Sequence, residues 1–202
     1  VDIVKIVESI TKYAVTVESP EDIRSVMEQA YHIAKEGRSG PVWIDVPLDV
    51  QGALVDPKQL PPWAIKESKV ESRDVLTNET ILEIQSLIEK AERPLIIAGH
   101  GVRLAGGANE FYTWVEKLGI PVVSTWNALD ILPYDHPLYI GRPGVVALRA
   151  PNFAVQNCDL LISIGCRLDN IITAYNPKGF AREAKKIVID VDQNEIDKLD
   201  MD

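Results

Sequence analysis

The sequence is poor in the residues that build metal centres and disulfide frameworks. Its 202 residues include two cysteines and three histidines, and no two of the histidines have the spacing of metal ligands. Cys158 and Cys166 do not form a disulfide framework, so we expect two free thiols in the core of a protein from a reducing, cytoplasmic compartment. The sequence therefore predicts no metal site in this chain.

Several motifs of catalysis and binding are also missing. There is no G-x-S-x-G nucleophile elbow and no G-x-x-x-x-G-K-[ST] phosphate loop. No apolar run approaches the roughly 20 residues of a membrane-spanning helix. The formal net charge of −9 disfavours nucleic acid or an anionic membrane as the main partner. We expect a soluble chain without a nucleic-acid or membrane partner and without a recognisable catalytic cluster.

The first part of the chain predicts only a small piece of a fold. It begins without Met and without the layout of a signal peptide, which we interpret as the start of a fragment. Residues 1–50 predict a helix, a strand, a second helix over 20–36 that ends at Gly37, and a last strand over 42–46. This is too little for an independent domain. Residues 51–76, interrupted by several prolines, have the composition of an extended linker.

The second part alternates between helices and strands. Apolar runs rich in Ile, Leu and Val are typical of strands that are buried on both faces of a parallel sheet. The expected elements are a helix starting near Asn78, strand 94–98, a glycine turn over 99–107, a helix that ends at Gly119, strand 120–124, a loop-rich stretch over 126–150, a short helix from Pro151, strand 159–165, a short helix over 179–185, strand 186–191 and a helix from Asn194. This order predicts an α/β fold with a Rossmann-like parallel sheet flanked by helices.

Glycines at the ends of these strands indicate a nucleotide-type pocket. The segment Gly99–Gly106 contains a G-x-G, but Leu104 stands at the third glycine position of the dinucleotide fingerprint, so a pocket and a plain turn are both compatible with it. Asp190 ends a strand, where it could bind a ribose hydroxyl or cap a helix. Arg142 and Arg167 each follow a glycine, where they could clamp a phosphate or form surface ion pairs.

Five segments together resemble one known family. They are Gly37–Gln51 (GRSGPVWIDVPLDVQ), Arg93–Gly101 (RPLIIAGHG), Leu118–Thr125 (LGIPVVST), Cys158–Asp169 (CDLLISIGCRLD) and Lys186–Asp192 (KIVIDVD). In order and spacing they resemble the thiamine-diphosphate-dependent enzymes, most closely the acetolactate synthase catalytic subunit. The resemblance implies that residues 1–50 are the tail of the pyrimidine-binding domain. Residues 51–76 would be a linker, and residues 77–202 most of the central domain, a six-stranded sheet that would be truncated at its C-terminal end.

The resemblance also implies a function for the parent enzyme. Such enzymes decarboxylate pyruvate or a similar 2-keto acid and transfer the two-carbon unit to a second 2-keto acid, in branched-chain amino-acid biosynthesis. Thiamine diphosphate and Mg²⁺ would be bound by regions outside this chain, so the chain alone would be inactive and would hold no catalytic residue. The parent would be a homodimer or homotetramer. Two alternatives stay open, namely a related 2-keto-acid decarboxylase or lyase and a non-catalytic nucleotide-binding module.

In the acetolactate synthase branch the central domain holds FAD. By position in the motifs, the resemblance assigns to such a cofactor Gly99, His100, Gly101, Thr125, Trp126, Arg142, Pro143, Gly144, Gly165, Cys166, Arg167, Asp190 and Val191. Arg167 would grip the diphosphate, and Asp190 with Val191 would meet the adenosine. The chain departs from the family pattern at three places: His100 replaces a glycine, Arg142-Pro143 replaces Met-His, and Ile171 replaces a second arginine. These departures could narrow the pocket or weaken anion binding, so FAD, ADP and no ligand all remain open.

Overall fold

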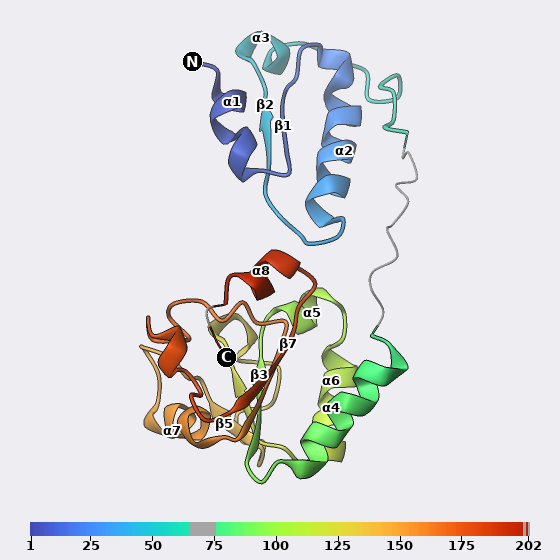
Figure 1. Cartoon of the computed structure of the whole chain (residues 1–202). Coiled ribbons are helices and arrows are strands. Elements are labelled where there is room, and N and C mark those ends of the chain that lie inside the picture. Colours follow the sequence, from blue (N-terminus) through green and yellow to red (C-terminus); the bar gives the residue numbers. More distant parts are fainter. Residues whose placement is uncertain (65–75, 200, 202) are drawn as a thin grey trace. The chain divides into compact units, whose positions relative to one another are not determined.

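The computed structural model of the chain describes residues 1–64, 76–199 and 201 (Figure 1). The chain divides into two compact units, Val1–Arg73 and Asp74–Asp202. The linker predicted over 51–76 falls partly on residues 65–75, which lie outside the described residues. The two units are therefore described separately.

The first unit contains the predicted helix, strand, helix and strand. Its elements are α1 (Ile3–Val7), η1 (Glu8–Ile10), β1 (Tyr13–Thr16), η2 (Pro20–Asp22), α2 (Ile23–Lys35), β2 (Val42–Asp45) and the additional short helix α3 (Leu48–Gln51). The strands β1 and β2 pair in parallel, with Tyr13 opposite Val42. The end of α2 is followed, as predicted, by Gly37 in the left-handed conformation with φ +61°.

The second unit is a parallel α/β sheet flanked by helices, as the sequence predicts. Its elements are α4 (Asn78–Lys90), β3 (Pro94–Ala98), α5 (Gly101–Leu104), α6 (Ala108–Leu118), β4 (Val122–Ser124), η3 (Trp126–Ala128), β5 (Tyr139–Gly141), α7 (Arg149–Asn157), β6 (Leu160–Ile164), η4 (Pro177–Gly179), β7 (Lys185–Ile189) and α8 (Gln193–Asp197). All pairs are parallel, and the strand order is β5-β4-β3-β6-β7. The described residues thus form five strands of the six that the resemblance implies.

The structure differs from the local predictions for the second unit at three places. The stretch over 126–150 is loop-rich as predicted, but it also contains strand β5, which the sequence did not predict because Tyr139–Gly141 is specified by its pairing with β4. The short helix expected over 179–185 is replaced by η4 and a turn, since β7 already begins at Lys185. The glycine turn over 99–107 includes the single-turn helix α5.

Two hydrophobic clusters cover the two faces of the five-stranded sheet. On one face, α4 and α6 contribute side chains such as Leu87 and Val115, which pack against Ile162 and its neighbours. On the other face, α7 and the segment after β6 contribute Val155 and Phe180. Figure 1 shows α4 and α6 on the opposite side of the sheet from α7. Burial on both faces explains the continuous apolar runs of the central strands.

The strand order sets where a ligand can bind. The chain runs from the central strand β3 outward through β4 to β5, and then returns to the other side of β3 to form β6 and β7. The connections that follow β3 and β6 therefore leave in opposite directions. In open α/β sheets, ligands bind outside the carboxyl ends of the strands at such a switch point. The candidate site is thus the edge where β3 and β6 end.

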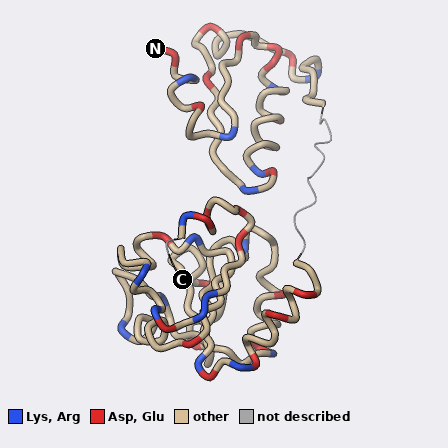
Figure 2. Tube along the Cα trace, in the orientation of Figure 1, with Lys and Arg blue, Asp and Glu red and all other residues tan. Residues whose placement is uncertain are grey.

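Two further observations concern the distribution of charge along the chain and the length of its helices. Figure 2 shows acidic and basic residues interspersed along both units rather than segregated by sign. Within the described ranges, we find no helix with the length and apolar character that crossing a bilayer requires.

Candidate nucleotide-binding site

The structure brings all thirteen predicted ligand residues to one edge of the sheet. Each strand of the second unit is followed by part of the set: Gly99, His100 and Gly101 after β3, Thr125 and Trp126 after β4, Arg142, Pro143 and Gly144 after β5, Gly165, Cys166 and Arg167 after β6, and Asp190 and Val191 after β7. Parallel strands end at the same edge, so these segments form a row along the carboxyl ends.

The centre of this edge is a junction of three glycines, which we call the glycine junction (Gly99, Gly101 and Gly165). The Gly99 N–H donates to the Ile164 carbonyl oxygen at 2.9 Å, and the Gly101 N–H donates to that of Gly165 at 3.0 Å. A Cβ on Gly99 would lie 2.0 Å from the Gly165 oxygen, and one on Gly101 would lie 2.7 Å from the Gly165 Cα. Only glycine permits this backbone approach.

Three backbone N–H groups beside the glycine junction are available to a ligand. Those of His100, Cys166 and Arg167 donate to no acceptor in the part of the chain that the structure describes. Unpaired N–H groups that lie close together can bind the oxygens of an anion. The glycine junction and these donors fit the diphosphate of a dinucleotide.

The side chains of the segment after β6 differ in what they offer. The Cys166 thiol is buried in the hydrophobic core, and this burial raises its pKa to about 11. Cys166 can therefore contact a ligand at this edge only through its backbone. The Arg167 side chain is exposed and has no ion pair with any described residue. Its guanidinium is the free positive charge next to the glycine junction.

His100 links the two turns that follow β3 and β4. Its Nδ1 lies 2.8 Å from the carbonyl oxygen of Asn127; since a carbonyl only accepts, Nδ1 carries the proton and donates. The Arg103–Asp130 ion pair, at 3.0 Å, connects the same two segments. His100 therefore braces the site through Nδ1, and its Nε2 remains for other contacts.

The turn after β5 is fixed in part by Asn152, a residue that the sequence did not single out. The Asn152 side chain, from α7, accepts from the Gly144 N–H at 2.8 Å and donates to the Gly144 carbonyl at 3.0 Å. Gly144 has φ +119°, and a Cβ there would lie 2.5 Å from the Ile171 carbonyl oxygen. Pro143 is buried. No motif marked Asn152, because a polar residue in a helix is ordinary.

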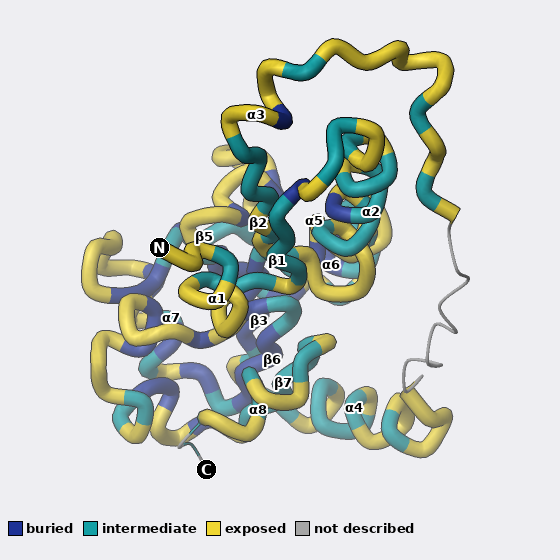
Figure 3. The backbone as a smooth tube through the Cα atoms, turned by 90° about the horizontal axis from the view of Figure 1, so that it is seen from above, coloured by how far each residue is buried: buried dark blue, intermediate teal, exposed yellow. Residues whose placement is uncertain are grey.

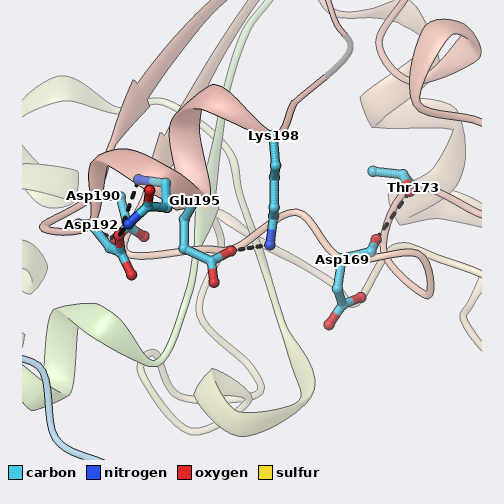
Figure 4. Close-up of polar contacts among 7 residues, drawn as sticks. Asp169, Thr173, Asp190, Asp192, Glu195 and Lys198 are labelled. Atoms are coloured by element: carbon cyan, nitrogen blue, oxygen red, sulfur yellow. Dashed lines mark hydrogen bonds and ion pairs between the residues drawn. The ribbon is translucent and has the colours of Figure 1, made fainter. Parts of the chain in front are cut away.

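The acidic residue at the end of β7 keeps one oxygen available. Asp190 Oδ1 accepts from the Asp192 N–H at 3.0 Å, and Asp192 in turn caps α8 at Asn194 (Figure 4). Asp190 Oδ2 has no hydrogen-bond partner among the described residues. It is therefore available to a ribose hydroxyl, while the adjacent Val191 offers an exposed apolar surface.

The described residues contain no group of three or more His, Cys, Asp or Glu side chains that could hold a metal ion. The Cys158 thiol is buried like that of Cys166, and desolvation raises its pKa to about 11 as well. Both thiols are therefore protonated at neutral pH and are poor nucleophiles.

Comparison with known proteins gives the family. The family model for the central domain of thiamine pyrophosphate enzymes matches residues 81–202. The chain is 39% identical over 190 residues to a probable acetolactate synthase large subunit of Methanocaldococcus jannaschii, covering 94% of this chain and 32% of that protein. It is 38% identical over 200 residues to the acetolactate synthase large subunit of Corynebacterium glutamicum, covering 98% and 31%.

A third relative, the acetolactate synthase isozyme 2 large subunit of Escherichia coli, is 33% identical over 199 residues, covering 98% of this chain and 35% of that protein. The chain thus spans about a third of the length of these curated relatives. Together with the match to more than half of its residues, the parallel sheet and the glycine junction show that the chain belongs to the family of thiamine pyrophosphate enzymes.

Proposed function

We propose that the chain works as part of an acetolactate synthase. The whole enzyme decarboxylates pyruvate, or a similar 2-keto acid, and transfers the two-carbon unit to a second 2-keto acid in branched-chain amino-acid biosynthesis. Support comes from the relatives, whose names agree and whose similarity extends over nearly the whole chain. Bound thiamine diphosphate supplies the electron sink for decarboxylation. In this proposal, residues outside this chain hold thiamine diphosphate and Mg²⁺. The chain itself contributes no catalytic residue.

The role proposed for the second unit is to bind FAD along the carboxyl edge of its sheet. The observation that carries this proposal is the glycine junction at the switch point, with unpaired N–H groups and the free Arg167 guanidinium beside it. The backbone of the junction and Arg167 hold the diphosphate. Asp190 and Val191 hold the adenosine, and the turns after β4 and β5 hold the flavin half.

The domain boundaries remain a proposal. Residues 1–50 belong to the pyrimidine-binding domain, residues 51–76 to a linker, and residues 77–202 to the central domain. The two-stranded sheet of the first unit supports this division, because two parallel strands alone do not make a stable sheet. The whole enzyme is a cytoplasmic homodimer or homotetramer in this proposal.

A calorimetric titration of the 202-residue chain with FAD tests the cofactor assignment. We expect binding that weakens at least tenfold in Arg167→Gln, because a hydrogen bond to a charged group contributes about 1.5–3 kcal/mol. Arg182→Gln removes the same charge at the opposite edge, before β7, and is the matched control. Failure of the wild-type chain to bind FAD at saturating concentration would refute the flavin assignment, and an ADP titration then decides whether the edge binds a smaller nucleotide.

Activity is tested separately with the complete gene product. It should form acetolactate from pyruvate when thiamine diphosphate and Mg²⁺ are present, whereas the 202-residue chain alone should not. Release of acetaldehyde without acetolactate would instead assign the enzyme to the 2-keto-acid decarboxylases.

A further inference from the structure

An arginine and a tryptophan from two different strand ends are stacked at the carboxyl edge. The Arg142 guanidinium carbon lies 4.5 Å from the centroid of the Trp126 ring. Arg142 follows β5 and Trp126 follows β4, so the guanidinium extends from the outer strand toward its inner neighbour. The other stacked cations of the described residues, Lys35 on Tyr31 and Arg149 on Phe153, are each four residues from their rings within one helix. Among the cation–aromatic pairs of the described residues, the Arg142–Trp126 pair alone joins separate elements.

The backbone that carries Arg142 is held on both sides. Asn152 binds both the N–H and the carbonyl of Gly144, and the Val145 N–H donates to the Ile171 carbonyl oxygen at 2.9 Å. Pro143, between Arg142 and Gly144, is buried. The chain thus fixes the base of the Arg142 side chain, and the Trp126 ring fixes its end.

The charge of Arg142 is not neutralised within the described chain. Arg142 is half-buried and forms no ion pair with a described carboxylate, although the protein carries 30 acidic residues. Two acidic residues lie in the segments that form this edge, but both have other partners. Asp130 pairs with Arg103, and Asp169 accepts from the Ile171 and Ile172 N–H groups. A stacked, partly desolvated guanidinium keeps its in-plane N–H donors for planar oxygen acceptors.

Position along the edge separates Arg142 from the glycine junction. Neighbouring strands are about 4.8 Å apart, so the end of β5 lies roughly 10 Å from the end of β3 and farther from β6. An ADP group whose ribose meets Asp190 and whose diphosphate meets the glycine junction occupies the ends of β7, β6 and β3. The ends of β4 and β5 are left for whatever extends beyond the diphosphate.

We propose that the Arg142 guanidinium donates to the carbonyl oxygens of the isoalloxazine ring of FAD, and that Trp126 is the positioning residue that holds Arg142 there. This inference rests on the proposed binding of FAD and adds to it that the two arginines have different roles. Arg167 recognises the diphosphate, which FAD and ADP share. Arg142 recognises the ring system, which ADP lacks, and so determines the preference for the flavin dinucleotide.

Parallel titrations of the full 202-residue chain with FAD and with ADP test the assignment. In Arg142→Gln we expect the Kd for FAD to rise about tenfold while the Kd for ADP stays within twofold. In Arg167→Gln both Kd values should rise at least tenfold. Arg182→Gln, the charge-matched control, should change neither.

Variants of the tryptophan test positioning rather than contact. Trp126→Leu should raise the Kd for FAD about fivefold without changing that for ADP, whereas Trp126→Phe, which keeps an aromatic face, should restore binding to within twofold of the wild-type value. Thermal unfolding identifies any variant that fails to fold. Should Arg142→Gln be one, Arg142→Lys, which keeps the charge but loses the planar donors, replaces it with the same expectation.

The outcomes separate this inference from the proposed function. Equal weakening of FAD and ADP in Arg142→Gln would place Arg142 at the diphosphate and overturn the inference while FAD binding stands. Unchanged FAD affinity in the folded variant would overturn it as well. A wild-type chain that binds ADP but not FAD, or neither ligand, would overturn both the flavin assignment and the role of Arg142.

Discussion

The two units of the chain use the same alternation of helix and strand with different results. In the first unit, β1 and β2 are at most half-buried (Figure 3), and the buried apolar residues are Val17, Ala30 and Val50. In the second, all three residues of β4 and nearly all of β3 and β6 are buried. The difference lies in the width of the sheet. A strand loses its contact with water only when it has a neighbour on each side and a helix on each face.

In the first unit, large apolar side chains stay exposed beside these few buried residues. The first unit exposes Ile6, Tyr31 and Leu48 over 61%, 67% and 84% of their surfaces. A lone two-stranded unit of this kind does not bury enough apolar surface to offset the entropy of ordering its chain. Stability should therefore be concentrated in the second unit.

Separating the units is the strongest test of this comparison. Residues 76–202 alone should unfold cooperatively on heating, because both hydrophobic clusters lie within them. Residues 1–64 alone should show no cooperative transition. Circular dichroism against temperature measures both, and a sharp transition in the smaller fragment would show that its few buried residues suffice.

Truncation of one core side chain per unit sharpens the comparison. Ile162 is fully buried in the interior strand β6, so Ile162→Ala should lower the unfolding free energy by about 3 kcal/mol. Ile44 is half-buried in β2, so Ile44→Ala should lower the unfolding free energy by only about 1 kcal/mol, since its site is partly open to water. Denaturant unfolding of the full chain gives both values. Equal losses would mean that the first unit is packed as tightly as the second.

The glycine junction should be sensitive to a single methyl group. Gly99→Ala places a Cβ 2.0 Å from the Gly165 carbonyl oxygen, so β3 and β6 must move apart, at a cost of about 2–3 kcal/mol. Gly119→Ala is the control: Gly119 has φ +64° but no atom within 4 Å of its Cβ position, so only backbone strain of about 1 kcal/mol remains. Denaturant unfolding measures both variants, and equal unfolding free energies for Gly99→Ala and Gly119→Ala would contradict this prediction.

The smallest expected effect concerns Asp159, which ties the start of β6 to the chain before β3. Its carboxylate accepts from the Glu92 and Arg93 N–H groups at 2.8 and 2.9 Å. Partial desolvation raises the pKa of Asp159, but these hydrogen bonds outweigh it and lower the pKa below its usual value.

Because the folded pKa is the lower one, the contribution of the Asp159 carboxylate is fully present above about pH 4, the usual range for an unfolded aspartate, and is lost as the pH falls through the folded pKa. Asp159→Ala should cost about 1 kcal/mol of unfolding free energy at pH 7. This cost should shrink as the pH falls through the folded pKa, because the wild type then loses the contribution of the carboxylate as well. Unfolding free energies between pH 2 and 7 measure the difference between the variant and the wild type. A difference that stays constant down to pH 2 would assign it to packing instead.

Much of the fold followed from patterns within single elements. The strand predicted over 94–98 has those bounds in the structure, because its burial on both faces leaves an uninterrupted apolar run. The helix that ends at Gly119 was predicted from its apolar spacing and its glycine. Strand β5 escaped prediction because its three residues are specified by pairing with β4 and carry no periodicity of their own.

The site was only partly predictable for the same reason. Glycines at strand ends and the family motifs indicated which residues reach the carboxyl edge. The Asn152 contacts with Gly144 and the stacking of Arg142 on Trp126 join residues of different elements, and no spacing rule marks such partners. The burial of the Cys166 side chain within the site segment is likewise a property of the packed core.

The glycine junction also limits how this protein can change over evolutionary time. At its centre the site presents main chain rather than side chains, and a substitution of these glycines first disturbs the sheet. If the edge binds a dinucleotide as proposed, we expect a change of ligand preference to arise at peripheral positions such as 126, 142 and 190, while the middle of the edge stays the same.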